Sequence, residues 1–91
     1  MKELKTYGND KYHQYIIGWT DDLKDKHVLI TEEGEDGNHI LRCICKLVSR
    51  DKMIPIFNVN TKKELNCSVQ HIYYYEKIYL LDKREDLALK L

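Results

Sequence analysis

The chain has 91 residues, a length that corresponds to one small domain with a modest hydrophobic core. Hydrophobic residues make up 43% of it, which is typical of a folded globule and excludes a largely disordered chain. Its 15 basic and 15 acidic residues cancel, which excludes the bulk positive charge that attracts nucleic acid without regard to site.

The charges are nevertheless distributed unevenly along the chain. Residues 1–37 carry nine acids and five bases, whereas residues 38–91 carry six acids and ten bases, so −4 in the first part balances +4 in the second. A dipolar surface of this kind can orient a charged partner. The alternative is that the two groups of charges neutralise each other across the fold.

Residues 1–11 are polar and contain the turn signal Gly8–Asn9–Asp10, so we expect this segment to be frayed. Residues 12–20 alternate and predict a strand with Tyr15 on one face and Ile16 on the other. The polar residues 21–26 predict a loop or a single helical turn. Residues 27–31 predict a short buried strand.

The centre of the chain predicts an antiparallel meander of three strands over residues 39–49, 53–59 and 64–69. Polar turn residues separate these strands. Pro55 lacks a backbone donor, so the second strand is expected to be an edge strand or to carry a bulge there.

Residues 71–81 are apolar and aromatic and predict a bend over 71–75 followed by a closing strand. Asp82 and Glu85 have the spacing of a capping box, which predicts a short C-terminal helix. Together the elements predict one mainly β domain of five to six short strands, a small antiparallel barrel or strongly bent sheet. An SH3-like barrel is favoured on strand order and loop length.

The three cysteines are Cys43, Cys45 and Cys67. Their odd number, with neither a secretory signal nor a membrane-spanning run, predicts free thiols in a reducing, cytoplasmic compartment. A single residue separates Cys43 from Cys45 on a strand, and this spacing suits zinc less well than Cys-x2-Cys. Cys67 with His39 or His71 would complete a set of four ligands. We expect small core side chains, no metal and no cofactor.

No nucleophile elbow, phosphate-binding glycine loop or His-Glu-x-x-His motif occurs, and the four histidines are scattered singly. The sequence therefore predicts a binding protein rather than an enzyme. Its size and composition suit a stoichiometric regulator or inhibitor of another protein. One concrete version is a factor encoded by a phage or mobile element that acts against a host enzyme or defence complex.

Two segments are candidates for the contact with a protein partner. The first is an acidic loop that would engage a basic surface, formed by Glu32, Glu33, Glu35 and Asp36. The second is an aromatic segment, because tyrosine is enriched in the centre of protein interfaces; it consists of Tyr73, Tyr74, Tyr75 and Tyr79.

The alternative partner is a single-stranded nucleic acid. A basic strip along the long central strand and its turn would track the phosphates, and it consists of Arg42, Lys46, Arg50 and Lys52. The tyrosines would then serve as stacking platforms for bases. The acidic loop opposes this interpretation if it lies on the same side.

Overall fold

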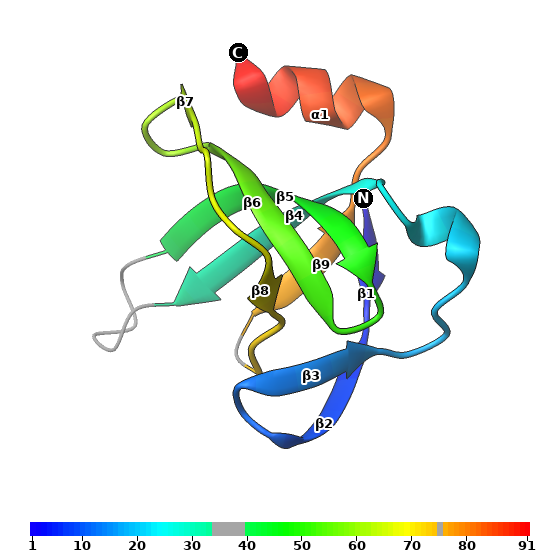
Figure 1. Cartoon of the computed structure of the whole chain (residues 1–91). Coiled ribbons are helices and arrows are strands. Elements are labelled where there is room, and N and C mark those ends of the chain that lie inside the picture. The colour runs from blue at the N-terminus through cyan, green and yellow to red at the C-terminus, as the bar shows by residue number, and fades with distance from the viewer. Residues whose placement is uncertain (34–39, 75) are drawn as a thin grey trace.

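The computed structural model describes residues 1–33, 40–74 and 76–91, and Figure 1 shows their arrangement. The elements in chain order are β1 (Lys2–Leu4), β2 (Thr6–Asp10), β3 (His13–Ile16), a 3-10 turn η1 (Asp21–Leu23), β4 (His27–Glu33), β5 (Ile40–Ser49), β6 (Lys52–Asn58), β7 (Lys63–Glu64), β8 (Gln70–His71), β9 (Lys77–Leu80) and α1 (Lys83–Lys90). The chain is thus mainly β with one short C-terminal helix, as predicted.

One antiparallel sheet follows the path β1-β9-β4-β5-β6-β7, with β8 also paired to β6, while β2 and β3 form a separate hairpin. In the part of the chain described, this path ends at β1 and β7, so the strands do not close into the predicted barrel. The physical reason is that the hairpin joins the sheet through the isolated bridge from Gln14 to Ile72 and scattered backbone hydrogen bonds rather than through a continuous ladder.

The N-terminal segment differs from the expectation of a frayed end. Lys2–Leu4 pairs with β9 and Thr6–Asp10 pairs with β3, so residues of the polar segment supply two strands. Backbone pairing to neighbouring strands holds this segment in place although few of its side chains are buried.

The central strands largely follow the prediction. The register of β5 against β6 shifts between Ile44 and Cys45, where Cys45 faces Pro55, which confirms the expected irregularity at the proline. The predicted strand over 64–69 is wrong for residues 65–69, which have no strand pairing. These residues lie between the short strands β7 and β8, which pair with opposite ends of β6.

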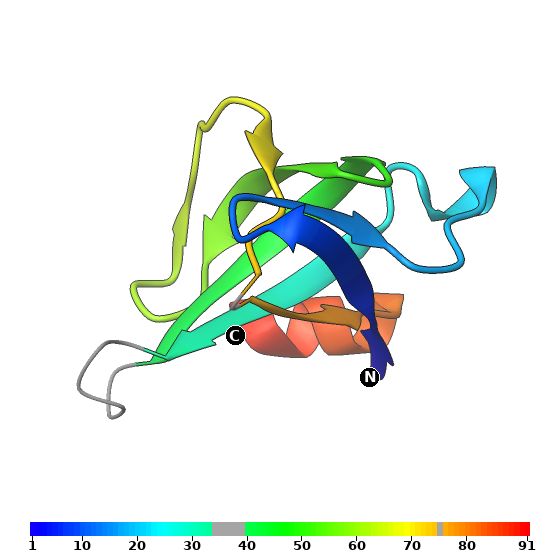
Figure 2. The same cartoon turned by 90° about the horizontal axis from the view of Figure 1, so that it is seen from below.

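The hydrophobic core has two parts, one on each face of the sheet. The first contains Val28 and Ile30 of β4 and is closed by Ile16 and Ile72 on the hairpin side. The second contains the intervening Leu29 and is covered on the α1 side by Leu89. Successive side chains of a strand point to opposite faces, so β4 is buried on both sides. Figure 2 shows α1 and the β2–β3 hairpin on opposite sides of the sheet.

The helix α1 begins with the predicted capping box. The side chain of Asp82 accepts from the backbone N–H of Glu85 at 2.8 Å, and the Glu85 side chain accepts from the backbone N–H of Asp82 at 3.2 Å. His27 Nδ1 lies 3.1 Å from Asp86 Oδ1 and links β4 to the helix. Local sequence therefore starts the helix, and a contact with the sheet anchors it.

We predict that Asp82→Ala frays α1, at a cost of about 1 kcal/mol, because it removes the bond that the Asp82 side chain accepts from the backbone N–H of Glu85. No residue of α1 is fully buried, so packing compensates little. Amide hydrogen exchange over residues 83–90 should accelerate in this variant. Lys83→Ala leaves the box intact and is the control; equal exchange in the two variants would argue against the cap.

Candidate functional site

The hairpin β2–β3 separates buried from exposed side chains by strand alternation. Gln14 and Ile16 point toward the core and are buried, whereas Tyr15 and Ile17 point outward and are exposed. The outer face of the hairpin therefore presents large apolar side chains to solvent.

Backbone hydrogen bonds fix the hairpin to the body of the sheet. The N–H of Gln14 donates to the carbonyl of Ile72 at 2.9 Å, and that of Ile16 donates to the carbonyl of Arg50 at 2.7 Å. The buried amide of Gln14 also donates to the carbonyl of Asp10 at 2.9 Å within the hairpin. The outer face is thus carried by a fixed element rather than by a loose arm.

One end of this face is a tyrosine pair with a cation stacked on it. Tyr7 and Tyr15 are directly opposite in the register of the hairpin, with 63% and 40% of their surfaces exposed. Ile17, 60% exposed, follows along β3. The guanidinium of Arg50 lies 5.0 Å from the centre of the Tyr15 ring, within cation–π range.

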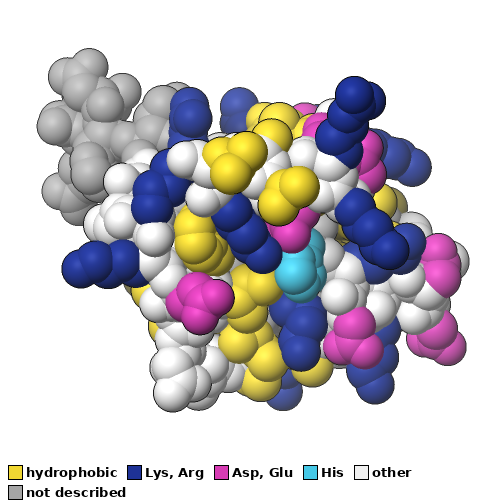
Figure 3. Space-filling view, turned by 90° about the horizontal axis from the view of Figure 1, so that it is seen from above, with side chains coloured by type: hydrophobic (Ala, Val, Ile, Leu, Met, Phe, Trp, Pro, Cys, Tyr) yellow, Lys and Arg dark blue, Asp and Glu magenta, His cyan; other side chains and the backbone are white. Residues whose placement is uncertain are grey.

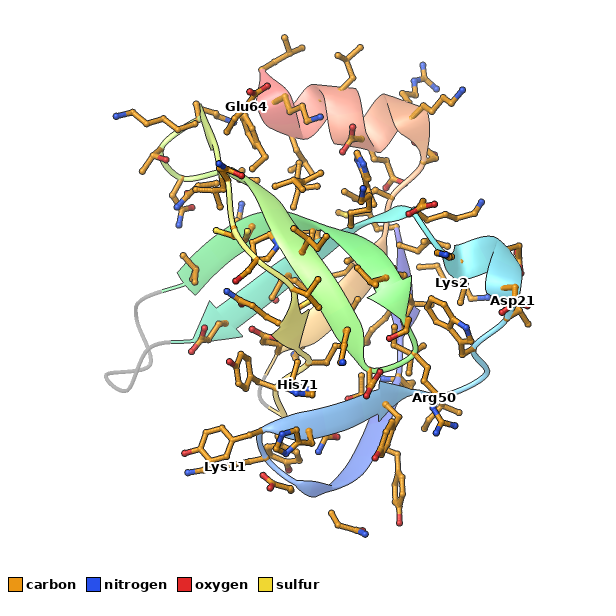
Figure 4. All side chains as sticks on the ribbon, viewed as in Figure 1. Lys2, Lys11, Asp21, Arg50, Glu64 and His71 are labelled. Atoms are coloured by element: carbon orange, nitrogen blue, oxygen red, sulfur yellow. The ribbon has the colours of Figure 1, made fainter. Side chains whose placement is uncertain are left out.

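The other end contains the turn of the hairpin and the segment after β8. The Tyr12 and Tyr73 rings meet edge to face with centroids 6.2 Å apart, and Lys11 Nζ lies 5.0 Å from the Tyr12 ring centre. Tyr74 is 69% exposed, and its N–H donates to the carbonyl of Lys11 at 2.7 Å. Figure 4 shows Lys11 and Arg50 toward opposite ends of β3.

Two histidines contact each other where the hairpin meets β8. The His13 and His71 rings are 4.4 Å apart, nearly perpendicular, and His13 Nδ1 lies 3.3 Å from Asp10 Oδ2. His71 Nδ1 is buried and makes no hydrogen bond with any residue that the structure describes. We use the name hairpin surface for the exposed residues Tyr7, Lys11, Tyr12, His13, Tyr15, Ile17, Arg50 and Tyr74.

The structure divides the predicted aromatic segment. Tyr74 lies on the hairpin surface. The half-buried Tyr73 contacts this surface through the ring of Tyr12. Tyr79 instead packs against the core on the α1 side of the sheet. The position of Tyr75 lies outside the described residues.

The predicted basic strip is divided as well. Arg42 and Lys46 share the face of Ile44, which belongs to the core on the α1 side, whereas Arg50 stacks on the hairpin. Lys52 is half-buried and pairs with His71 in the register of β6 and β8. Figure 3 shows Lys and Arg interspersed with acidic and apolar side chains on the side seen from above, with no continuous basic patch there.

The predicted acidic loop begins later than expected. Glu32 and Glu33 belong to β4, where they pair with Leu41 and Ile40, and the Glu32 side chain is half-buried. The ladder with β5 extends this strand past the predicted end because β5 is itself ten residues long. Glu35 and Asp36 lie outside the described residues.

Glu76 is a half-buried acid that sequence reasoning did not single out. Burial raises the pKa of this carboxyl to about 7, although the backbone N–H of Tyr73 donates to it at 3.2 Å and acts in the opposite direction. A single Glu between aromatic residues in the sequence carried no signal of this environment.

A hollow of about 470 Å³ lies beside α1, and its lining includes His27, Asp82 and Asp86. Asp82 caps the helix and Asp86 contacts His27, so these two carboxylates hold the helix in place. Within residues 1–33, 40–74 and 76–91, no three His, Cys, Asp or Glu side chains gather closely enough to hold a metal ion.

Comparisons with known proteins supply no relative: no family model, no curated protein and no solved structure matches the chain. Among the helices described, none has both the length and the apolar character needed to cross a membrane. Sequence reasoning missed Tyr7, Tyr12 and Tyr15; the alternation of residues 12–17 was the available signal.

Proposed function

We propose that the chain is a non-enzymatic, stoichiometric protein-binding module and that the hairpin surface is its contact site. The observation that carries this proposal is the exposed pair Tyr7 and Tyr15, extended by Ile17 and bordered by Arg50. Tyr and Arg are the residue types enriched among those that dominate binding energy in protein interfaces.

The fixed position of these side chains supports the same proposal. Arg50 is already stacked on the Tyr15 ring in the free protein, so less side-chain entropy is lost when a partner covers them. Regulation or inhibition of an enzyme or defence complex, by a cytoplasmic protein of phage or mobile-element origin, remains the concrete form of this proposal. It is supported by small size and by the exposed interface-type residues.

Single-stranded nucleic acid is the second candidate, supported by the two cations over tyrosine rings, Arg50 on Tyr15 and Lys11 on Tyr12. The division of the basic residues between two faces weighs against it, because a strand needs a continuous cationic track. Nucleic-acid binding would weaken steeply with salt through counterion release, whereas binding centred on aromatic side chains would weaken little.

For the fold, we propose that the chain is an opened variant of the SH3-like barrel. The support is the bridge from Gln14 to Ile72, which places β3 next to the end of β8 as a closing strand would lie. An experimental structure in which this contact extends into a ladder would support the proposal, and one in which the hairpin detaches would count against it.

We predict that Tyr7→Ala combined with Tyr15→Ala reduces capture of the partner at least tenfold, since two hot-spot side chains together contribute about 2 kcal/mol or more. The assay is affinity capture from lysate of the cells that carry the gene, with nuclease present. Leu87→Ala on α1 is the control, because Leu87 is also exposed but lies on the opposite side of the sheet.

Folding of the double variant is checked by thermal unfolding, and little change is expected because both side chains are exposed. Equal capture by the folded double variant and the Leu87 variant would rule out the hairpin surface. Loss of capture on nuclease treatment alone would favour the nucleic-acid candidate.

A further inference from the structure

Cys43 and Cys45 bring their sulfur atoms together on the hairpin-facing side of β5. The two Sγ atoms are 4.0 Å apart, and the thiol of Cys45 donates to the sulfur of Cys43. Cys43 is half-buried, while Cys45 is 1% exposed within the core. One cysteine of the pair is therefore partly exposed to solvent, and the other lies in the core.

The surroundings favour the thiolate of Cys43. The thiol of Cys45 and the backbone N–H of Phe57 donate to this sulfur, and together they lower the pKa of Cys43 despite burial and the nearby carboxyl of Glu76. The same hydrogen bond, together with burial, raises the pKa of Cys45. The pair thus contains one activated sulfur and one that stays protonated.

The pairing of β5 is irregular on its β6 side at this place, whereas its pairing with β4 is continuous. Cys45 faces Pro55, which has no N–H to donate, and the register shifts between Ile44 and Cys45. The Cα atoms of residues i and i+2 in a strand are about 6.6 Å apart, near the upper limit for a disulfide. A bridge between these residues would be strained, and strained disulfides are the labile, readily reduced ones.

We propose that Cys43 and Cys45 form a peroxide-reactive dithiol, in which a hydroperoxide oxidises Cys43 and Cys45 then closes an intrastrand disulfide. The Cys43 thiolate attacks one peroxide oxygen, the O–O bond breaks, and hydroxide leaves and takes up a proton. Cys43 is then a sulfenic acid. The Cys45 sulfur attacks it, the S–O bond breaks, and the hydroxyl departs with the Cys45 proton as water.

The electrons balance in this sequence. The two thiols together lose two electrons and two protons. Hydrogen peroxide takes up these electrons and protons, and two molecules of water form. Cellular thiols reverse the modification by exchange through a mixed disulfide at Cys43, the more exposed residue of the pair. The dithiol is independent of the hairpin surface, so it can be tested without knowledge of the partner.

The test uses the complete folded chain treated with hydrogen peroxide, then alkylated under denaturing conditions and digested with trypsin. Cleavage after Arg42 and Lys46 releases residues 43–46 with both cysteines, whereas Cys67 falls in another peptide. We expect the 43–46 peptide to lose two hydrogens and to escape alkylation before Cys67 is modified, because the lowered pKa of Cys43 increases its thiolate fraction.

Cys67→Ser should leave this reaction unchanged. Cys45→Ala should stop it at the sulfenic acid of Cys43, which dimedone traps as a stable adduct. Because Cys45 is buried, folding of that variant is checked first, and the peptide map of the wild-type chain stands independently of it. Oxidation of Cys67 ahead of Cys43, or a disulfide between Cys43 and Cys67, would overturn the proposal.

Discussion

Gly8→Ala should destabilise the chain by about 2–3 kcal/mol, as overpacking does where the surroundings are backbone. A Cβ at residue 8 would lie 2.5 Å from the carbonyl oxygen of His13 and 2.7 Å from the Gln14 side-chain nitrogen. A carbonyl of the paired strand cannot move without disturbing the ladder, so the hairpin must shift. A loss of this size is a large part of the stability of a small domain.

Binding at the hairpin surface should fall together with stability, because Gly8 sets the spacing of the strands that carry Tyr7 and Tyr15. Chemical denaturation measures the loss of stability, and partner capture measures the loss of binding. Gly18→Asn is the control: Gly18 has a positive φ of 75° and no described atom within 4 Å of an added Cβ, and Asn tolerates that conformation. A Gly8 variant as stable as the Gly18 variant would contradict the close approach.

The free energy of unfolding should decrease as pH rises through about 7, owing to Glu76. The raised pKa in the folded state means that folding favours the protonated acid. This contribution is complete below the unfolded value of 4.5 and is lost as the folded carboxyl ionises near pH 7. A pKa difference of one between the folded and unfolded states corresponds to about 1.4 kcal/mol in the free energy of unfolding. Partial solvent contact reduces the total contribution of Glu76 to about 2 kcal/mol.

Glu76→Gln isolates the contribution of this carboxyl to the pH dependence of stability. The amide oxygen of Gln can still accept from the N–H of Tyr73, as the carboxyl does. Urea denaturation at pH 5 and pH 8 should therefore show a smaller pH dependence in the variant than in the wild type. Identical pH dependence in the two chains would mean that Glu76 is ionised without cost.

Elements with local signals were the ones that the sequence predicted correctly. The capping box places both of its partners, Asp82 and Glu85, within one turn, so the start of α1 follows from neighbouring residues. The irregularity at Pro55 follows from the missing N–H of proline. Neither prediction needs knowledge of distant contacts.

The candidate site depended on distant contacts and was mostly missed. Tyr12 and Tyr73 are far apart in sequence and meet because the hairpin turn lies beside the segment after β8. Arg50 reaches Tyr15 because the β5–β6 turn accepts the N–H of Ile16. Tyr79 resembles Tyr73 in the sequence, yet strand pairing with Leu29 turns it toward the other face.

The measurement that tests the central claim most directly is site-specific photocrosslinking in the cells that carry the gene. A photoreactive phenylalanine analogue replaces Tyr7 in one variant and Leu87 on α1 in another, and both positions are exposed. We predict one discrete, nuclease-resistant protein adduct at position 7, absent at position 87 and competed by the unmodified chain. Adducts at position 87 alone, or a nuclease-sensitive adduct at position 7, would contradict protein binding through the hairpin surface.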